Sequence, residues 1–113
     1  MMNPIRSEKV KEIIAEEISL WTERHKAEPD GKEKIKIHGA ISLLMVLSGI
    51  PNQITREFLL QEYKYYKRRA ENAEIKDREL DLIARNRAVK SCEMLVSLGK
   101  KIAELEATLD KQK

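Results

Sequence analysis

Apolar residues recur at intervals of three and four positions along most of this chain, which is the spacing of one face of an α-helix. The first stripe covers residues 10–25 and ends before the turn-forming stretch EPDG at 28–31. Pro4 suits the first turn of such a helix. Glutamates and lysines fill the opposite face, and we expect Glu16 and Glu17 to be surface charges.

The next segment, KEKIKIHGAISLLMVLSG at 32–49, is apolar on nearly every side of a helix. A helix of this kind is usually buried, so we expect it to lie in the middle of the fold. Its end is marked by Gly49, Ile50 and Pro51. The order predicts a glycine cap, with Gly49 in the left-handed backbone region.

From Asn52 to the end the chain has no proline and one glycine, Gly99. An unbroken helix over this length would be on the order of 80 Å long, and its far end would need partners. The alternative is a bend near 72–77, which would let the tail fold back as the fourth helix of a bundle. We favour the continuous helix, because 68–79 lacks the glycine or proline of a tight helix–helix turn.

Two apolar series lie along the last part of this helix. The first series alternates steps of four and three, as in a coiled coil, and is the predicted oligomer interface: Ala84, Ala88, Ser91, Leu95, Leu98, Ile102, Leu105 and Leu109. The second series lies on a neighbouring face and repeats every seven residues: Ile75, Leu82, Val89, Val96 and Ala103.

These patterns predict an all-α protein: a small helical head followed by a long C-terminal helix that forms a coiled coil or a helical bundle. The head covers residues 1–66 and holds three helices, the third of which continues onward. The long C-terminal helix covers 67–113 and either oligomerises or packs as a bundle.

Composition agrees with long solvated helices, since 36% of the 113 residues are charged and 4% are aromatic. Cys92 is the single cysteine, so an internal disulfide is excluded and a reducing, cytoplasmic location is expected. The most apolar stretch, GAISLLMVLSGI, has about a dozen residues, whereas a membrane span needs about 20. We therefore expect no membrane association.

The stretch YKYYKRR at 63–69 combines three tyrosines with four cations. Helical geometry places two of the tyrosines on an apolar face and the cations toward water. One interpretation is an ordinary solvated helix face. The other is a phosphate-contacting patch of Lys64, Tyr65, Arg68 and Arg69.

The stretch LLMVLSGIPNQITREFLLQEY at 43–63 resembles the helix-turn-helix of DNA-binding proteins. One position departs from that pattern, because Thr55 stands where the family usually has an aliphatic residue. The resemblance implies DNA binding through the start of the second helix, with candidate base contacts from Asn52, Gln53, Thr55 and Arg56. A purely structural turn is the alternative.

The sequence shows no pattern typical of catalysis. His25 and His38 are the only histidines, and neither has cysteines or carboxylates at ligand spacing. A glycine-rich phosphate loop and a nucleophile elbow are also absent. We therefore expect no enzyme activity, no cofactor and no metal site.

The predicted function is that of a non-catalytic interaction protein: an adaptor, inhibitor or regulator. It would bind an unidentified protein partner and self-associate, as a homo-oligomer, through its C-terminal helix. The first alternative is a DNA-binding transcriptional regulator that uses the helix-turn-helix-like element at 40–66 and the basic patch at 64–69. The second is a structural subunit of a larger assembly. Small size and high charge also suit an accessory protein of a phage or mobile element.

Overall fold

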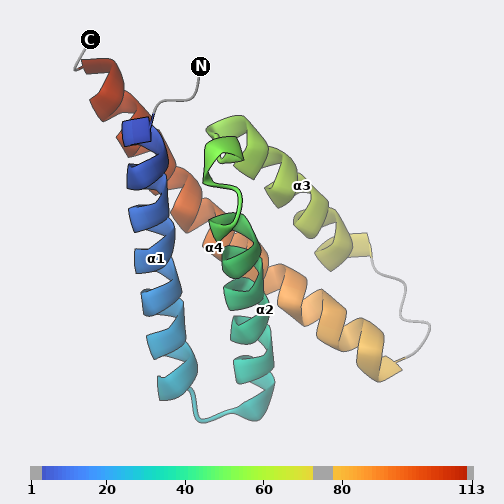
Figure 1. Cartoon of the computed structure of the whole chain (residues 1–113). Coiled ribbons are helices and arrows are strands. Elements are labelled where there is room, and N and C mark those ends of the chain that lie inside the picture. The colour runs from blue at the N-terminus through green and yellow to red at the C-terminus, as the bar shows by residue number, and fades with distance from the viewer. Residues whose placement is uncertain (1–3, 73–77, 112–113) are drawn as a thin grey trace.

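The computed structural model describes residues 4–72 and 78–111, with the side chains of 5–71 and 87–111. Within these residues the chain is all-α (Figure 1). The elements are the helices α1 (Pro4–Ala27), α2 (Gly31–Ser48), α3 (Arg56–Asn72) and α4 (Arg78–Lys111), with a short 3₁₀ turn, η1 (Pro51–Gln53), between α2 and α3.

Helix α1 follows the predicted stripe. Val10, Ile14 and Trp21 are at most 4% exposed and face the rest of the molecule. The helix ends at Ala27, and Asp30 then caps α2 by accepting a 2.9 Å hydrogen bond from the backbone N–H of Lys32. The EPDG stretch therefore ends one helix and begins the next.

The end of α2 differs from the prediction. Gly49 has φ −82° and ψ −10°, so its backbone is right-handed and does not require glycine. The Gly49 N–H donates to the Val46 carbonyl at 3.1 Å, and the Ile50 N–H donates to the Leu47 carbonyl at 3.1 Å, as in a tightened last turn. Pro51, which has no N–H, then starts η1 and changes the direction of the chain.

The expectation that α2 is the central helix is wrong. Met45 and Val46 on α2 are 62% and 65% exposed. The helix that packs against all the other helices is α4, which runs behind α1 and α2 and alongside α3 (Figure 1). A helix that is apolar on nearly every side can thus leave one side open.

The expectation of one continuous helix from Asn52 onward is also corrected. Helix α3 ends at Asn72, α4 begins at Arg78, and α4 returns along α3 (Figure 1). The predicted bend at 72–77 falls almost wholly outside the described residues. The longest dimension of the molecule is 52 Å, well below the length of an unbroken rod.

One hydrophobic core joins the two parts that the sequence suggested. It includes Ile37 and Leu59 from residues 1–66, and Leu98 and Ile102 from residues 67–113. The division into a head and a C-terminal helix remains an interpretation of the sequence. In the structure both parts contribute side chains to the same buried cluster.

Helices α2 and α4 lie close together at Gly39. A Cβ atom built on this glycine would lie 2.6 Å from Cβ and 3.0 Å from Cα of Arg87. These distances are shorter than side chains tolerate, so the crossing depends on the missing side chain. Because α2 packs closely on α4 here, residues of α4 line the bottom of the groove between α2 and α3.

Candidate functional site

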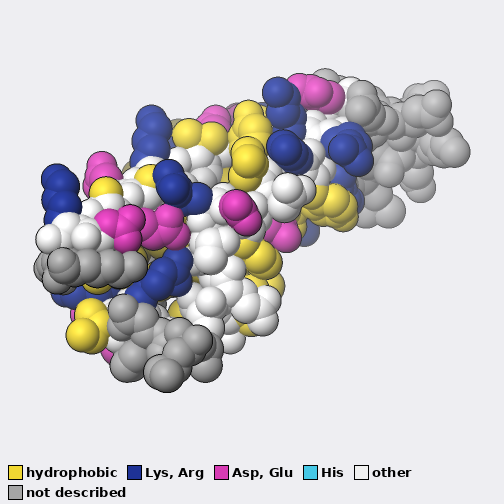
Figure 2. Space-filling model, turned by 90° about the horizontal axis from the view of Figure 1, so that it is seen from above, with side chains coloured by type: hydrophobic (Ala, Val, Ile, Leu, Met, Phe, Trp, Pro, Cys, Tyr) yellow, Lys and Arg dark blue, Asp and Glu magenta, His cyan; other side chains and the backbone are white. Residues whose placement is uncertain are grey.

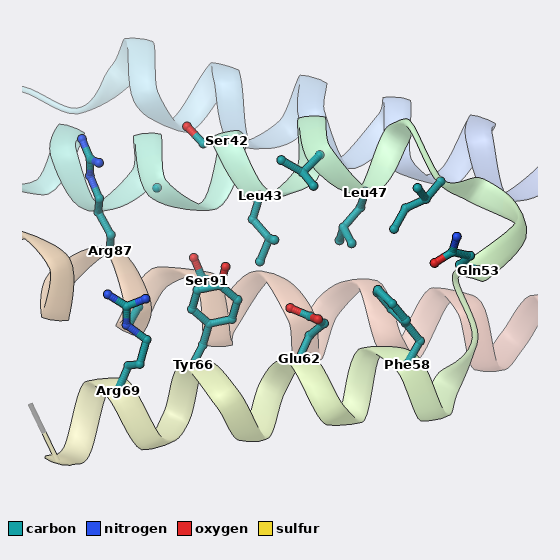
Figure 3. A pocket seen from close by; sticks show the side chains of 14 residues that line it. Ser42, Leu43, Leu47, Gln53, Phe58, Glu62, Tyr66, Arg69, Arg87 and Ser91 are labelled. Atoms are coloured by element: carbon teal, nitrogen blue, oxygen red, sulfur yellow. The ribbon is translucent and has the colours of Figure 1, made fainter.

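A groove of about 630 Å³ lies between α2 and α3, with α4 as its floor. Figure 3 shows Leu43 and Leu47 entering it from α2, and Phe58 and Tyr66 from α3. The two walls pack on α4 rather than on each other, which is why the space between them stays open. We call this space the α2/α3 groove.

The groove is long enough for a short helix. Its α2 wall extends from Gly39 to Ile50, and its α3 wall from Phe58 to Arg69. At 1.5 Å per residue each wall is roughly 16 Å long, or about three helical turns. On the α2 rim Val46 is 65% exposed, so apolar surface continues from the groove to the outside.

Charge is unevenly placed along the groove. Arg69 and Arg87 lie at one end, Glu62 lies near the middle, and Gln53 lies at the other end (Figure 3). Burial raises the pKa of the Tyr66 phenol above its usual value, and the neighbouring Glu62 carboxylate raises it further. Tyr66 therefore keeps its proton and can donate a hydrogen bond into the groove.

The helix-turn-helix candidates are mostly engaged in contacts that fix the turn. Asn52 lies in η1 and accepts a hydrogen bond from Ser7 of α1. Thr55 caps α3, because its Oγ1 accepts a 3.0 Å hydrogen bond from the N–H of Phe58. Arg56 pairs with Glu106 of α4 at 2.9 Å.

Gln53, the remaining base-contact candidate, is exposed at the groove end. Helices α2 and α3 run in opposite directions and form a hairpin that lies on α4 (Figures 1 and 3). The helices of a DNA-binding helix-turn-helix cross more steeply, at about 90–120°. The turn in this chain is thus held by α1 and α4, and its local shape is that of an α-hairpin.

The tyrosines of the 63–69 stretch divide as the helical geometry predicted. Tyr63 and Tyr66 pack against the core, and Tyr65 is 51% exposed. Arg69 lies over the ring of Tyr65, 5.7 Å from its centre, and donates a 3.0 Å hydrogen bond to its hydroxyl. Tyr65 and Arg69 therefore form one exposed unit.

Lys64 and Arg68 are exposed and form no ion pair within the described residues. Figure 2 shows several Lys and Arg side chains close together beside the grey atoms at one end of the molecule. The candidate phosphate contacts thus share an exposed basic surface on the second half of α3.

The predicted oligomer interface faces inward. Ala88, Ser91, Leu95, Leu98 and Ile102 are at most 2% exposed within the single chain. Leu105 packs against the same core and Leu109 is half-buried, whereas the side chain of Ala84 lies outside the described part. The first series is therefore covered mainly by the chain's own helices, and another copy would need a different surface.

Glu17 is a buried charge that the sequence interpretation placed in water. It is 1% exposed, forms an ion pair with Lys101, and accepts hydrogen bonds from Ser97 at 3.1 Å and Trp21 at 3.2 Å. Its position, three residues after Ile14 and four before Trp21, puts it on the buried stripe. That spacing was the signal that could have identified it.

Other chemistry-bearing residues do not gather into a site. The rings of His25 and His38 lie 6.3 Å apart, but the described residues contain no group of three or more histidine, cysteine or acidic side chains arranged to hold a metal ion. Burial raises the pKa of the Cys92 thiol, with a further contribution from Glu71. Among the described helices, none is long and apolar enough to cross a membrane.

Comparison with protein-family models, curated proteins and solved structures found no match to this chain.

Proposed function

We propose that this protein is a non-catalytic interaction protein that binds an amphipathic helix of a protein partner in the α2/α3 groove. The observation that carries the proposal is the open groove itself, which has two helical walls and an α4 floor. Laying the apolar face of a helix into such a groove is a common mode of peptide recognition. An adaptor, inhibitor or regulator in the cytoplasm would act in this way.

The lining indicates what the bound helix should carry. Val46, Ile50 and Phe58 line the groove and keep exposed surface, so they suit apolar side chains repeated at helical spacing. Arg69 and Arg87 at one end favour an acidic residue there, because the apolar walls lower the local dielectric and strengthen the attraction. The bound segment would therefore be an apolar-faced helix with an acidic end.

The test compares two exposed apolar positions of similar chemistry. Val46 lies on the groove rim, and Leu20, 51% exposed on α1, lies away from it. A partner captured from the native cell by the wild-type protein should be retained by Leu20→Glu and lost by Val46→Glu, with helix content unchanged in both. Equal capture by wild type and Val46→Glu would contradict the proposal.

Nucleic-acid binding is the second candidate, and the exposed cations on α3 favour it. Lys64 and Arg68 have no ion pair within the described residues, and the Tyr65–Arg69 unit offers a ring and a guanidinium for stacking. The contact would use this basic surface rather than the turn, since Thr55 and Arg56 are engaged. A structural subunit of a larger assembly remains the third interpretation.

Salt-dependent titration of short DNA duplexes tests this candidate. Changing Lys64, Arg68 and Arg69 to alanine should abolish binding that survives physiological salt. The matched control removes the same charge from Lys9, Lys11 and Lys26, which pair with glutamates of their own helix. Absence of binding by the wild type at low salt would eliminate this candidate, because phosphate contacts are strongest there.

A further inference from the structure

Helix α4 is covered on one side. The side that carries Leu95, Leu98 and Ile102 is buried by the other helices. On the other side, Val89 and Val96 remain 42% and 45% exposed. These two valines belong to the second apolar series, for which the single chain supplies no complete cover.

The exposed valines belong to an apolar line that continues through the partly buried Ala103 to the exposed Ala107. Val89, Val96 and Ala103 are seven residues apart, and Ala107 follows four residues later. At 100° per residue all four lie within a sector of about 40°, along roughly 27 Å of helix. We call this line the outer face of α4.

Space beside the outer face is also apolar. A groove of about 370 Å³ between α3 and α4 is lined by Leu60, Tyr63 and Val96, and Leu60 is 48% exposed. Apart from its chain neighbours and the nearby backbone of α4 itself, no atom lies within 4 Å of the position that a Cβ on Gly99 would take. The surface next to Val96 can therefore receive side chains from another molecule.

We infer that the outer face of α4 binds a second copy of this chain, with the two α4 helices antiparallel about a two-fold axis near Val96. In this arrangement Val96 meets Val96 of the second copy. Val89 meets Ala103 of the second copy, so a larger side chain lies against a smaller one at both ends. A two-fold axis makes the same surface serve both molecules.

Charge supports the antiparallel direction. Glu93 and Lys100 lie seven residues apart on the same flank of the outer face. Antiparallel pairing about Val96 brings Glu93 close to Lys100 of the second copy, twice in the dimer. A parallel pair would instead place Lys100 of the second copy on the opposite flank of the interface, where it could not pair with Glu93.

Lys100 is available for this contact, since it is exposed and makes no ion pair within the described part of the chain. Glu93 is half-exposed and contacts Arg24 and Lys90. The proposed dimer shares no lining residue with the α2/α3 groove. Self-association and partner binding would therefore be independent, and each could fail without the other.

Light scattering and equilibrium sedimentation of the purified chain test the dimer. Wild type should reach twice the chain mass of 13.1 kDa as its concentration rises toward roughly 1 mM, the weak end of specific affinities. Val96→Glu should remain a monomer with an unchanged helical spectrum. Val46→Glu, the matched control on the other exposed apolar site, should dimerise as wild type does.

Charge exchange tests the orientation. Lys100→Glu and Glu93→Lys should each weaken dimerisation by roughly tenfold, because each removes two exposed ion pairs and creates two like-charge contacts. The double variant should recover most of the wild-type affinity. Glu93→Lys also removes the contacts of Glu93 with Arg24 and Lys90 within one chain. Melting curves measured at low protein concentration, where the chain is monomeric, separate that loss of stability from the weaker dimerisation.

Disulfide trapping in a Cys92→Ser background gives an independent readout. A mixture of the Val89→Cys and Ala103→Cys variants should cross-link to each other, and Val89→Cys alone should not. A wild type that stays at 13.1 kDa throughout, a dimer unaffected by Val96→Glu, or self-linking of Val89→Cys would overturn the inference.

Discussion

The two sides of α4 carry similar apolar repeats and have different environments. On the inner side Leu95, Leu98 and Ile102 are at most 2% exposed, beneath helices from the same chain. On the outer face Val89 and Val96 keep more than 40% of their surface exposed. The comparison indicates that a seven-residue repeat identifies an apolar helix face, but not whether the other helices of the chain cover that face.

Two features mark the borders between these sides. Toward α1, the buried Glu17 carboxylate binds Lys101 and Ser97 of α4. Toward α3, Cys92 lies half-buried, near Lys67 and Glu71.

The largest expected difference is in the free energy of unfolding, between the Leu98→Ala and Val96→Ala variants. Leu98 is fully buried, so its truncation leaves a cavity and should lower the free energy of unfolding by about 2–5 kcal/mol. Val96→Ala should change the stability of the single chain by less than about 0.5 kcal/mol. Chemical denaturation at low protein concentration measures both, and equal losses would show that the two faces are not distinct.

At the border toward α1, removing one charge of the Glu17–Lys101 ion pair should lower the free energy of unfolding. Lys101→Met leaves the Glu17 carboxylate buried without its cation, which should cost on the order of 3 kcal/mol of unfolding free energy. Adding Glu17→Gln should recover much of this loss, because no uncompensated charge then remains buried. A double-mutant cycle measures the coupling. If the losses of unfolding free energy from the two substitutions simply add, the Glu17–Lys101 ion pair does not stabilise the contact between α1 and α4.

Gly39 within α2 and Gly49 directly after it should differ in their tolerance of a side chain. Gly39→Ala forces a methyl group against Arg87 on α4 and should destabilise the fold by about 1–3 kcal/mol. Gly49→Ala should be nearly neutral, since its backbone is right-handed and the nearest atom to the new Cβ, the Val46 carbonyl oxygen, lies at 3.4 Å. Thermal unfolding of both variants checks this. A stable Gly39→Ala would argue against the close crossing.

The smallest effect concerns the Cys92 thiol. Burial raises its pKa above 9.0, so at pH 8 less thiolate is present than on a free cysteine, and alkylation should be slower. Met45→Cys in a Cys92→Ser background, at a 62% exposed position, should react at the rate of a free thiol. Equal rates would indicate that the α3 border is open to solvent.

The same shift has a consequence for stability. The folded state holds the Cys92 proton more tightly than the unfolded chain does, so the thiol ionises first in the unfolded chain as pH rises. Its contribution to stability is complete below the unfolded pKa and is lost as pH rises through the folded pKa. Cys92→Ser should remove this part of the alkaline loss of stability.

Local features of the sequence were sufficient for the helices and several of their ends. Three-and-four spacing predicted the buried stripe of α1, and EPDG predicted the break before α2. Tyr63 and Tyr66 face the core as the spacing of α3 required. These features depend on residues a few positions apart, which backbone propensity and periodicity describe well.

Long-range features were not predictable in this way. The choice between a continuous rod and a returning helix depends on how much apolar surface α4 buries on α2 and α3, and 68–79 carries no glycine or proline to signal it. The burial of Glu17 likewise depends on Lys101, which is 84 residues away along the chain. Local spacing showed where Glu17 points, but not the partner that makes its burial favourable.

The order of neighbouring residues is enough to show that this protein is helical and which faces of its helices are apolar. Only the tertiary structure decided that α4 returns, which of its two series α1, α2 and α3 cover, and that a groove stays open between α2 and α3. Apolar burial has no preferred direction, so the sequence pattern shows which helix faces are apolar. Three-dimensional packing then determines which of these faces the other helices bury.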